Sequence, residues 1–383
     1  MNVHTPLTLL GGLSASAFMQ RHWQRKPLLV RQAIPGFSPL LTRQALFSLA
    51  AEPQVESRLV MGEDDGRRDW QMRRGPFQRR QLPALAEPDW TLLVQGVDLH
   101  HDGVAELMHQ FRFLPDARLD DVMISYATDR GGVGPHFDSY DVFLLQAHGQ
   151  RRWRIGRQKN LHLQEGLPLK ILADFEPEQE WVLEPGDMLY LPPNYAHEGV
   201  AVGECMTYSI GFRVPQVADL AREVLMRVSD AAGEVLPETL YRDAGQAAVT
   251  QPAAIPSAMQ DFASQAVARA LQDPHSVARA LGEYLTEPKA QVWFDSAPRP
   301  RKLPAVRLDR RTRMMYDRHH VFVNGESWRA AGADARLMRR LADQRYLEAN
   351  DLRQASEAAV ALLKEWCESG WAHAVTKESL TRS

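Results

Sequence analysis

Two separated segments of this chain carry the side chains that a mononuclear metal site needs. The first segment, Gly131–Tyr140, contains His136 and Asp138, and the second segment, Glu184–His197, ends on a histidine. Residues i and i+2 of an extended segment project to the same face, so His136 and Asp138 can point together at one ion. A third ligand must then come from another strand, and His197 is the candidate. The fold is therefore constrained to bring these two segments side by side.

Two imidazoles and one carboxylate on one face of a metal ion leave its opposite face open. This facial triad is typical of non-haem iron(II) oxygenases. A structural zinc site is disfavoured, because such sites usually have four protein ligands, few of them carboxylates. The pattern predicts that His136, Asp138 and His197 bind one iron(II) ion and form the catalytic centre. The alternative is a loop histidine that is satisfied by a nearby carboxylate.

A second His-x-Asp tripeptide, His100–Asp102, shows that the tripeptide alone is weak evidence. It follows a predicted strand end at Leu92–Val97 and precedes Val104–Met108, where we expect a helix. Aspartate is among the preferred residues at a helix N-cap. We therefore predict that Asp102 caps this helix and that His100 and Asp102 bind no metal.

Short apolar segments separated by Gly and Pro turns surround both metal-binding segments. Glycines at 131, 132 and 134 let the backbone pass close to other groups without a Cβ clash. The expected strands are Val122–Tyr126, Val142–Gln146, Arg151–Ile155, Met188–Leu191 and Cys205–Phe212. Many short strands with such turns predict a double-sheet jelly roll, the architecture that includes the cupins.

The composition is that of an ordinary globular protein, with 44% hydrophobic and 24% charged residues. A chain of 383 residues favours two or three domains. No apolar run is long enough for a transmembrane helix, and Met1–Leu10 does not resemble a signal peptide. The two cysteines, Cys205 and Cys367, form no disulfide framework, so we expect a cytoplasmic protein in a reducing compartment.

Charge gives a weaker indication of partners. The net charge of −3 opposes general binding to nucleic acid, so we expect no sequence-specific nucleic-acid partner. Basic residues nevertheless concentrate between Arg299 and Arg318. This basic strip either touches RNA or an acidic partner, or forms a solvated linker and an exposed strand.

Three segments of the chain resemble one protein family. The segments Gly131–Phe143 and Glu184–Pro193, together with the N-terminal Phe18–Pro27, are similar to the Jumonji-C (JmjC) branch of the cupin oxygenases. More specifically, they resemble the bacterial ribosomal oxygenases, which hydroxylate an arginine of a large-subunit ribosomal protein. The motifs cover roughly the first 214 residues, and beyond them the resemblance rests on layout. It implies Fe(II) as cofactor, 2-oxoglutarate as co-substrate and a ribosomal protein as partner.

The chain is predicted to be an α+β protein in three parts. Residues 1–214 form a JmjC catalytic domain, a double-stranded β-helix or jelly-roll cupin. Residues 215–290 show helical periodicity at Val217–Val228, about Met259–Leu271 and Val277–Leu285. Such helices bury little by themselves, so we expect this region to form a homodimer. Residues 291–383 resemble the winged-helix domain of the ribosomal oxygenases, with a hairpin turn at Asn324-Gly325 and helices at about 333–344 and 354–368.

The distal carboxylate of 2-oxoglutarate requires a cation inside the barrel. The family's co-substrate arginine falls on Arg151, and a guanidinium matches a carboxylate with two hydrogen bonds. Strand alternation puts Arg151 on the same face as Trp153, and a tryptophan favours the inside. Tyr126 and Thr207 are hydroxyl candidates for the same carboxylate. The alternatives are a surface arginine and two ordinary packed strand residues.

Substrate recognition is less constrained by the sequence. Asp129 and Tyr140 are expected near the mouth of the site, where they could meet a substrate guanidinium. Their alternatives are a loop-capping aspartate and a packed tyrosine. Three functions stay open: a protein hydroxylase, which the resemblance favours, an N-methyl demethylase with the same iron chemistry, and a non-enzymatic cupin that only binds.

Overall fold

The computed structural model describes residues 2–62 and 70–375, together with all side chains of this range except those of residues 234 and 235. The chain divides into two compact units, Met1–Val214 and Pro215–Ser383. The first contains the expected catalytic strands, and the second contains the expected helical and winged-helix regions.

The first unit is built on one antiparallel sheet. Its strands lie in the order β1-β8-β6-β9-β5-β4-β2-β3, and β7 also pairs with β6. Their bounds are β1 Leu28–Val30, β2 Ser57–Met61, β3 Gln71–Arg74, β4 Trp90–Val94, β5 Leu119–Ala127, β6 Val142–Gly156, β7 Gln179–Leu183, β8 Met188–Leu191 and β9 Ala196–Phe212. Helices α1 (Ala15–Arg21), α2 (Arg43–Ala50) and α3 (Asp102–His109) and the 3-10 turns η1 (Thr8–Leu10), η2 (Arg79–Gln81) and η3 (Val97–Leu99) complete it.

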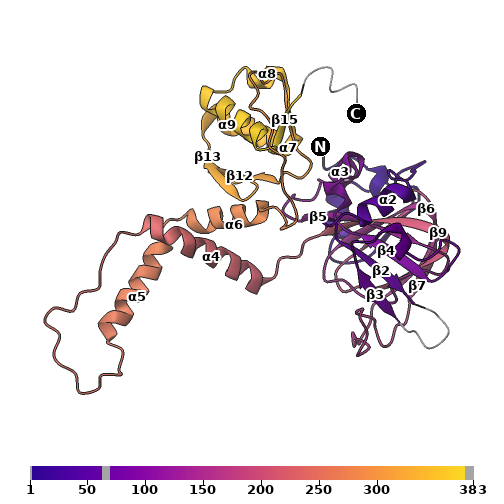
Figure 1. Ribbon diagram of the computed structural model, residues 1–383, viewed down its shortest axis with the longest axis horizontal. Helices are drawn as coiled ribbons and strands as arrows, with labels where there is room; N and C mark the ends of the chain where they lie inside the picture. The colour runs from indigo at the N-terminus through magenta and orange to yellow at the C-terminus, as the bar shows by residue number, and fades with distance from the viewer. Residues whose placement is uncertain (1, 63–69, 376–383) are drawn as a thin grey trace. The chain divides into compact units, whose positions relative to one another are not determined.

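The long strands β6 and β9 hold this sheet together (Figure 1). The first part of β6, Val142–Leu145, lies between β8 and β9. The later part, Arg151–Ile155, lies between β7 and β9. The first residues of β6 are buried on both faces, because Phe143 and Leu145 belong to one core and Val142 and Leu144 to another.

The pairing of β6 with β9 is irregular between Gln146 and Gln150, where the register shifts twice. Such an irregularity changes which face successive side chains occupy. Before it, Phe143 and Leu145 belong to the main core, and after it, Trp153 and Ile155 join a second, smaller core. The odd-numbered residues of β6 thus change from the main core to the second core, which Val142 and Leu144 join before the irregularity.

The helices of the first unit begin at or next to polar residues that can cap a helix N-terminus. The Ser14 side chain caps α1 by accepting from the Ala17 amide, and Thr42 caps α2 through the Ala45 amide. The expectation for Asp102 was wrong by one residue, because His101 occupies the N-cap of α3 and Asp102 is its first helical residue. An acidic residue in the first turn still complements the positive end of the helix dipole.

A buried carboxylate joins the N-terminal segment to the central strands. Asp141 accepts hydrogen bonds from the Tyr190 hydroxyl at 2.6 Å, from Gln24 Nε2 at 3.1 Å and from the Arg118 guanidinium at 3.2 Å. Its backbone carbonyl accepts from the Phe212 amide at 3.1 Å. Burial raises the pKa of the Asp141 carboxyl, and the three donors oppose that shift. Sequence reasoning did not single out this residue, although it lies three positions after Asp138.

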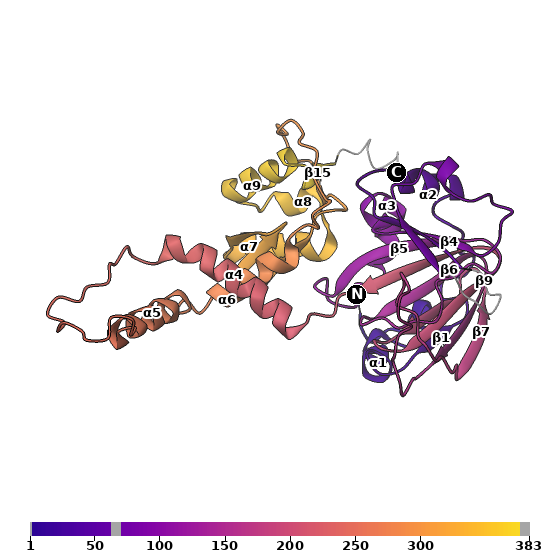
Figure 2. The same cartoon turned by 60° about the horizontal axis from the view of Figure 1, so that its bottom comes forward.

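The second unit opens with α4 (Val217–Val235), α5 (Ser257–Ala270) and α6 (Ser276–Thr286). These helices lie where the periodicity predicted them. Helix α4 packs along α6 and contacts α5. Within this unit, the loop before α5 and α5 itself extend outward from the other elements (Figure 2).

The rest of the second unit is a small α/β assembly with its own core around Leu341, Leu363 and Trp366. Its elements are β10 Val306–Leu308, β11 Met314–Tyr316, β12 His320–Val323, β13 Glu326–Arg329, α7 Gly332–Gln344, β14 Tyr346–Leu347, α8 Ala349–Leu352, α9 Glu357–Glu368 and β15 Ala372–Ala374. The expected hairpin turn at Asn324-Gly325 joins β12 to β13, and both residues have positive φ, as a two-residue hairpin loop requires.

Helix α6 packs directly on the hairpin of this assembly. A Cβ atom on Gly282 would overlap the ring of Phe322, so only glycine lets α6 come this close to β12. The structure therefore joins α6 to the winged-helix part within one compact unit, whereas the sequence predicts it in a separate region, 215–290.

We predict that Asp141→Ala destabilises the first unit by roughly 3–5 kcal/mol, because it leaves the donors of a buried ion pair without an acceptor. Glu204→Ala is the matched control, since Glu204 pairs with Arg43 at a site where both side chains are 39% exposed. Exposed pairs contribute about 0–1 kcal/mol. Urea denaturation of the two variants measures the difference, and equal losses would contradict the structural role of Asp141.

Candidate metal centre and co-substrate cavity

Three potential metal ligands meet where the first segment approaches the start of β9. The Asp138 Oδ2 atom lies 3.6 Å from His197 Nε2 and 4.0 Å from His136 Nε2. One ligand atom of each of the three residues lies within 4.8 Å of the other two. These separations suit three ligands on one face of a single ion.

Backbone carbonyls orient both imidazoles. Nδ1 of His136 lies 2.9 Å from the Gly134 carbonyl oxygen, and Nδ1 of His197 lies 2.9 Å from that of Tyr195. With a proton on each Nδ1, each Nε2 offers its lone pair to a metal, and such partners are typical of metal-binding histidines. Gly134 has φ +75°, and a Cβ there would approach the Trp70 ring to 2.9 Å. Glycine is therefore needed at this position.

The two histidines are also joined through their own backbones. The His136 amide donates to the His197 carbonyl at 3.0 Å, and the His197 amide donates to the His136 carbonyl at 2.8 Å. The Asn194 amide donates to the Asp138 carbonyl at 2.7 Å. All three candidate ligands are thus fixed by main-chain bonds that do not depend on a metal.

The three side chains differ in exposure. The side chain of His197 is 4% exposed, whereas those of His136 and Asp138 are each 23% exposed. Burial, together with the neighbouring His136, lowers the pKa of His197 to about 4. His197 is therefore neutral near pH 7, which is the form that binds a metal.

A cavity of about 410 Å³ opens beside the triad and contains the predicted co-substrate arginine. Arg151 is only 4% exposed, and among the described residues no hydrogen-bond acceptor meets its Nε or one of its terminal nitrogens. A buried cation with unsatisfied donors fits an anionic ligand, because such donors are costly to leave unpaired. The residues present therefore fit a bound 2-oxoacid.

Trp153 lines the same cavity and lies near both the arginine and His197. Its ring is 5.8 Å from the Arg151 guanidinium carbon and 5.9 Å from the His197 ring. The expectation that Arg151 and Trp153 share an inward face is confirmed by the lining of the cavity.

Thr207 also lines the cavity, but its hydroxyl already has a partner. Thr207 Oγ1 donates to Gln146 Oε1 at 2.9 Å, and the amide nitrogen of Gln146 is held by the His148 carbonyl at 2.8 Å. Thr207 could therefore donate to a carboxylate only by giving up this bond. Its role stays a prediction.

The structure does not place Tyr126 where the sequence analysis expected it. Tyr126 pairs with Met206 across β5 and β9, and both belong to the main core. Its ring packs at 5.1 Å from Phe47 and 5.3 Å from Trp90, and burial raises the pKa of its hydroxyl to about 12. Ser125 is the residue paired with Thr207, and it lines the cavity instead. Strand alternation separates Ser125 from Tyr126, but only the register of β5 against β9 decides which of the two shares a face with Thr207.

The two predicted substrate residues lie in different surroundings. Tyr140 lines the cavity, is 39% exposed and contributes to its mouth. Asp129 accepts a hydrogen bond from the Gly203 amide at 2.8 Å, as the loop-capping alternative predicted. The cavity is also lined by Lys170, Arg58 and Asp120. The sequence did not indicate the two basic residues.

A jelly-roll sheet that holds a His-Asp-His set beside a buried arginine defines the class of iron(II)- and 2-oxoglutarate-dependent oxygenases. Residues 106–220 match the JmjC domain family, and residues 269–373 match the ROXA-like winged helix family. The second match begins before α6, in agreement with the packing of α6 on β12.

Individual relatives agree with these domains. The chain is 36% identical to the ribosomal protein uL16 3-hydroxylase of Escherichia coli over 73% of each chain. It is 35% identical to a probable ribosomal oxygenase of Haemophilus influenzae over 54% of this chain and 52% of the relative. The chain belongs to the JmjC-type ribosomal oxygenases, and the predicted fold class, with its cupin and winged-helix parts, is confirmed.

Solved structures extend the likeness to almost the whole chain. The crystal structure of E. coli YcfD covers 94% of this chain and 98% of its own, with a TM-score of 0.80 at 30% identity. A second structure of YcfD, described as a ribosomal oxygenase in complex with cobalt and 2-oxoglutarate, matches with a TM-score of 0.76. The chain is thus a 2-oxoglutarate-dependent dioxygenase that uses iron(II).

Within the described part of the chain, no helix has the length and apolar character needed to span a membrane.

We predict that His136→Ala and Asp138→Ala each reduce the affinity for cobalt(II), used as a probe for iron(II), by at least tenfold, because each removes a direct ligand. His148→Ala is the control, since His148 is an exposed histidine on β6. The visible absorption of cobalt added to chelator-treated protein measures the affinity. Unchanged cobalt binding in a folded Asp138→Ala variant would contradict the assignment.

Proposed function

We propose that the protein hydroxylates an arginine side chain of a large-subunit ribosomal protein, the counterpart of uL16. The observation that carries this proposal is the buried Arg151 beside the His-Asp-His set, in a chain 36% identical to the uL16 3-hydroxylase. The non-enzymatic alternative is disfavoured, because all three potential ligands and the co-substrate cation are retained.

The residues of the site have separate roles in metal binding and in co-substrate binding. His136, Asp138 and His197 hold the iron, and Arg151 binds the distal carboxylate of 2-oxoglutarate through paired N–H donors. With dioxygen, iron(II) and 2-oxoglutarate supply an oxidation that yields succinate and carbon dioxide and transfers one oxygen atom to a substrate C–H bond. Leu144 and Trp153 give the cavity apolar walls that limit water near the reacting groups.

Recognition of the substrate is assigned to the mouth of the cavity. Tyr140 offers an aromatic face and a hydroxyl, and a guanidinium can stack on such a ring. Asp120, whose carboxylate pairs with Arg213 at 3.1 Å, adds negative charge near a basic substrate. Asp129 has a smaller part in this proposal, because its carboxylate caps the Gly203 loop.

Mass spectrometry of the substrate tests the function. Incubation of the uL16 counterpart with enzyme, iron(II), 2-oxoglutarate and oxygen should add about 16 Da on an arginine, as insertion of one oxygen atom requires. Asp138→Ala enzyme is the control for metal-dependent turnover. A loss of about 14 Da from an N-methylated protein would identify a demethylase instead. If the uL16 counterpart stays unmodified while the enzyme is active, this substrate is excluded.

We predict that Arg151→Gln raises the KM for 2-oxoglutarate by roughly 10- to 100-fold, because a charge-assisted pair contributes about 1.5–3 kcal/mol. The iron requirement should change little. Arg152→Gln is the matched control, since Arg152 is exposed on the opposite face of the same strand. Succinate production at varied 2-oxoglutarate measures both variants. Equal KM values for Arg151→Gln and the wild type would move the role to another residue.

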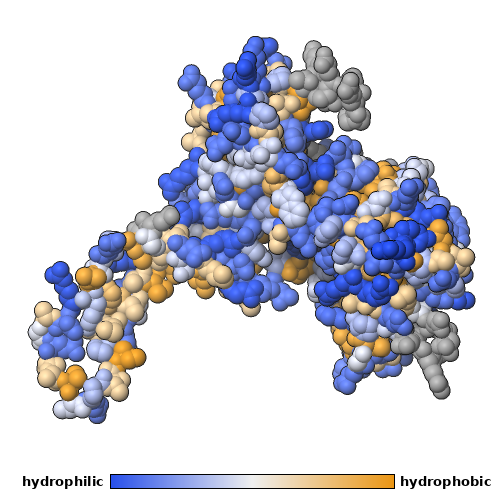
Figure 3. All heavy atoms as spheres, viewed as in Figure 1, coloured by the Kyte–Doolittle hydropathy of each residue, from blue (hydrophilic) through white to orange (hydrophobic). Residues whose placement is uncertain are grey.

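We further infer that the helices of the second unit form a homodimer in the cytoplasm. Helices α4 and α5 expose large apolar side chains to solvent, among them Val217 at 87%, Leu225 at 56%, Met226 at 55% and Val267 at 63%. Figure 3 shows such apolar side chains, in orange, on the surface of α5 and its neighbouring loop. Apolar surface on this scale commonly marks an interface, and two-fold dimers are the commonest solution.

The double variant Leu225→Glu/Met226→Glu should be monomeric if this surface is the interface, because it places two charges in an apolar contact. Val202→Glu is the control, since Val202 is a 46% exposed apolar residue on β9. Light scattering at matched concentrations measures the mass in solution. A double variant that still has the wild-type dimeric mass would exclude α4 from the interface.

A further inference from the structure

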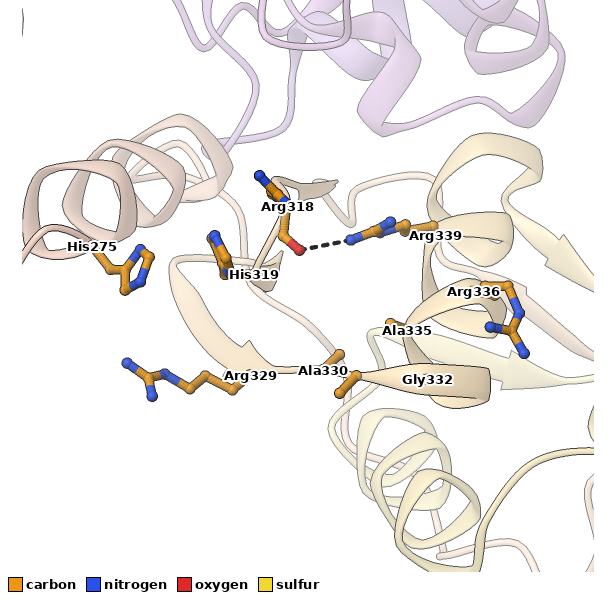
Figure 4. A pocket seen from close by; sticks show the side chains of 10 residues that line it. His275, Arg318, His319, Arg329, Ala330, Gly332, Ala335, Arg336 and Arg339 are labelled. Carbon is orange, nitrogen blue, oxygen red and sulfur yellow. Dashed lines mark hydrogen bonds between the residues drawn. The ribbon is translucent and has the colours of Figure 1, made fainter.

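The second unit contains a cavity of about 670 Å³ whose charged lining is entirely basic. Figure 4 shows its side chains, which come from the residue before α6, the β11–β12 turn, the end of β13 and the start of α7. The lining residues are His275, Arg318, His319, Arg329, Arg336 and Arg339, with small residues between them. None of this surface belongs to the site described above.

Three of these arginines have guanidinium groups that are available to a ligand. Arg318, Arg329 and Arg336 are exposed, and within the described part of the chain their guanidinium groups make no hydrogen bond or ion pair. In Figure 4, the side chain of Arg329 extends away from its strand and that of Arg336 points away from α7. Other arginines of this unit differ, since Arg299 pairs with Glu368 and Arg311 with Asp309.

Arg339 holds the turn that carries Arg318. Arg339 donates to the carbonyl oxygens of Asp317 at 3.3 Å and Arg318 at 2.9 Å. Its guanidinium carbon also lies 5.5 Å from the centre of the Tyr316 ring. The position of Arg318 is therefore set by α7, and the separation between the cations on the turn and those on the helix is built into the fold.

Nearby carboxylates are committed to other partners. Asp317 accepts from the His319 and His320 amides, each at 2.6 Å, and pairs with the His320 ring at 3.3 Å. Asp334, in the first turn of α7, accepts from the Ser356 hydroxyl at 2.6 Å and from its amide at 3.1 Å. These contacts direct both negative charges toward groups other than the lining arginines.

The N-terminus of α7 adds to the positive potential. This helix of 13 residues begins at Gly332, and the residue before it, Ala331, has no side chain that could cap it. Both residues line the cavity. Amide groups at a helix N-terminus, with the positive end of the helix dipole, favour a negative ligand.

The spread of the lining arginines favours a polymer with several phosphates over one compact anion. A guanidinium matches a phosphate with two parallel hydrogen bonds. Arg318, Arg329 and Arg336 come from a turn, a strand and a helix, so they suit several phosphates along a polymer better than one compact anion. The rings of His275 and His319 lie 4.4 Å apart in the same cavity. Flat imidazole and guanidinium groups can stack on the bases of single-stranded RNA. An acidic peptide has no such bases, so this lining favours RNA over an acidic peptide.

We propose that this cavity binds the phosphodiester backbone of RNA, with Arg318, Arg329 and Arg336 as its phosphate contacts. Recognition is independent of base sequence, because guanidinium contacts to phosphates carry no sequence information. The local cluster acts against a whole-chain charge of −3, so binding is confined to this face of the second unit. The proposal does not depend on the hydroxylase function, since it concerns different residues and a ligand that undergoes no reaction.

The test uses the full chain and a fluorescently labelled, unstructured single-stranded RNA of about 12 nucleotides in an anisotropy titration at several salt concentrations. The wild type should bind with an affinity that falls as salt rises. The triple variant Arg318→Gln/Arg329→Gln/Arg336→Gln should bind at least tenfold more weakly at low salt. Its plot of log affinity against log salt should be flatter by about two units, since each phosphate contact to a single strand contributes roughly 0.7.

The matched control is Arg301→Gln/Arg307→Gln/Arg353→Gln, which removes three exposed arginines of the same unit from outside the cavity. This control has the same net charge as the cavity variant and should bind within about twofold of the wild type. Equal weakening in the two triple variants would overturn the proposal, because binding would then follow net charge alone.

Competition with the labelled RNA distinguishes three kinds of negatively charged ligand: RNA, a small oxyanion and an acidic protein. Inorganic phosphate should displace the RNA only at millimolar concentrations, and polyglutamate of matched charge should compete at least tenfold less well than unlabelled RNA. Displacement by inorganic phosphate at the concentration of RNA itself would identify a small-oxyanion site, and equal competition by polyglutamate would identify an acidic-protein site. Either result would overturn the RNA assignment.

Circular dichroism and thermal melting establish that each variant is folded. If the triple variant does not fold, Arg329→Gln replaces it, because this exposed side chain makes no contact that the fold of the described residues needs. Arg329→Gln should weaken RNA binding by at least threefold and Arg329→Lys by less, because lysine keeps the charge but loses the paired donors. An Arg329→Gln variant with wild-type RNA affinity would overturn the assignment of this residue and of the cavity.

Discussion

The reciprocal backbone hydrogen bonds between His136 and His197 are the constraint on which the candidate metal site depends. They join a loop before β6 to the start of β9, so that two residues far apart in sequence become neighbours. Because these bonds use main-chain groups, the imidazoles stay free and are oriented separately by the carbonyls of Gly134 and Tyr195. The site is thus held in place before any metal binds, which lowers the conformational cost of binding.

The co-substrate cavity depends on a second feature, the irregular pairing of β6 with β9 between Gln146 and Gln150. Without the two register shifts, strict alternation from Phe143 and Leu145 would direct Arg151 and Trp153 into the main core. With them, Val142, Leu144, Arg151 and Trp153 all line the cavity. An irregularity of this kind costs regular pairing locally, but it moves the odd-numbered residues of β6 from the main core to the face that lines the cavity.

The second unit uses its many arginines in two ways. Some are paired inside the fold, as Arg311 is with Asp309, whose carboxylate also lies 2.9 Å from His373. Neither alternative for the strip between Arg299 and Arg318 anticipated this contact, because Arg311 is paired within the fold. Others, such as Arg329 and Arg336, surround an open cavity. The number of arginines in a stretch of sequence does not distinguish paired from unpaired arginines, because pairing depends on which acidic residues the fold brings close.

The sequence by itself determined the class of chemistry, the candidate ligands, the strands that carry the site and the main helices of the second unit, because i and i+2 projection, turn residues and helical periodicity act over a few residues. Arg151 and Trp153 could be assigned to one face for the same reason. The pairing of Ser125 with Thr207, the core position of Tyr126, the buried Asp141 network and the attachment of α6 to β12 were decided only by tertiary structure. Each depends on register or on contacts between distant segments, and local patterns do not encode which segments become neighbours.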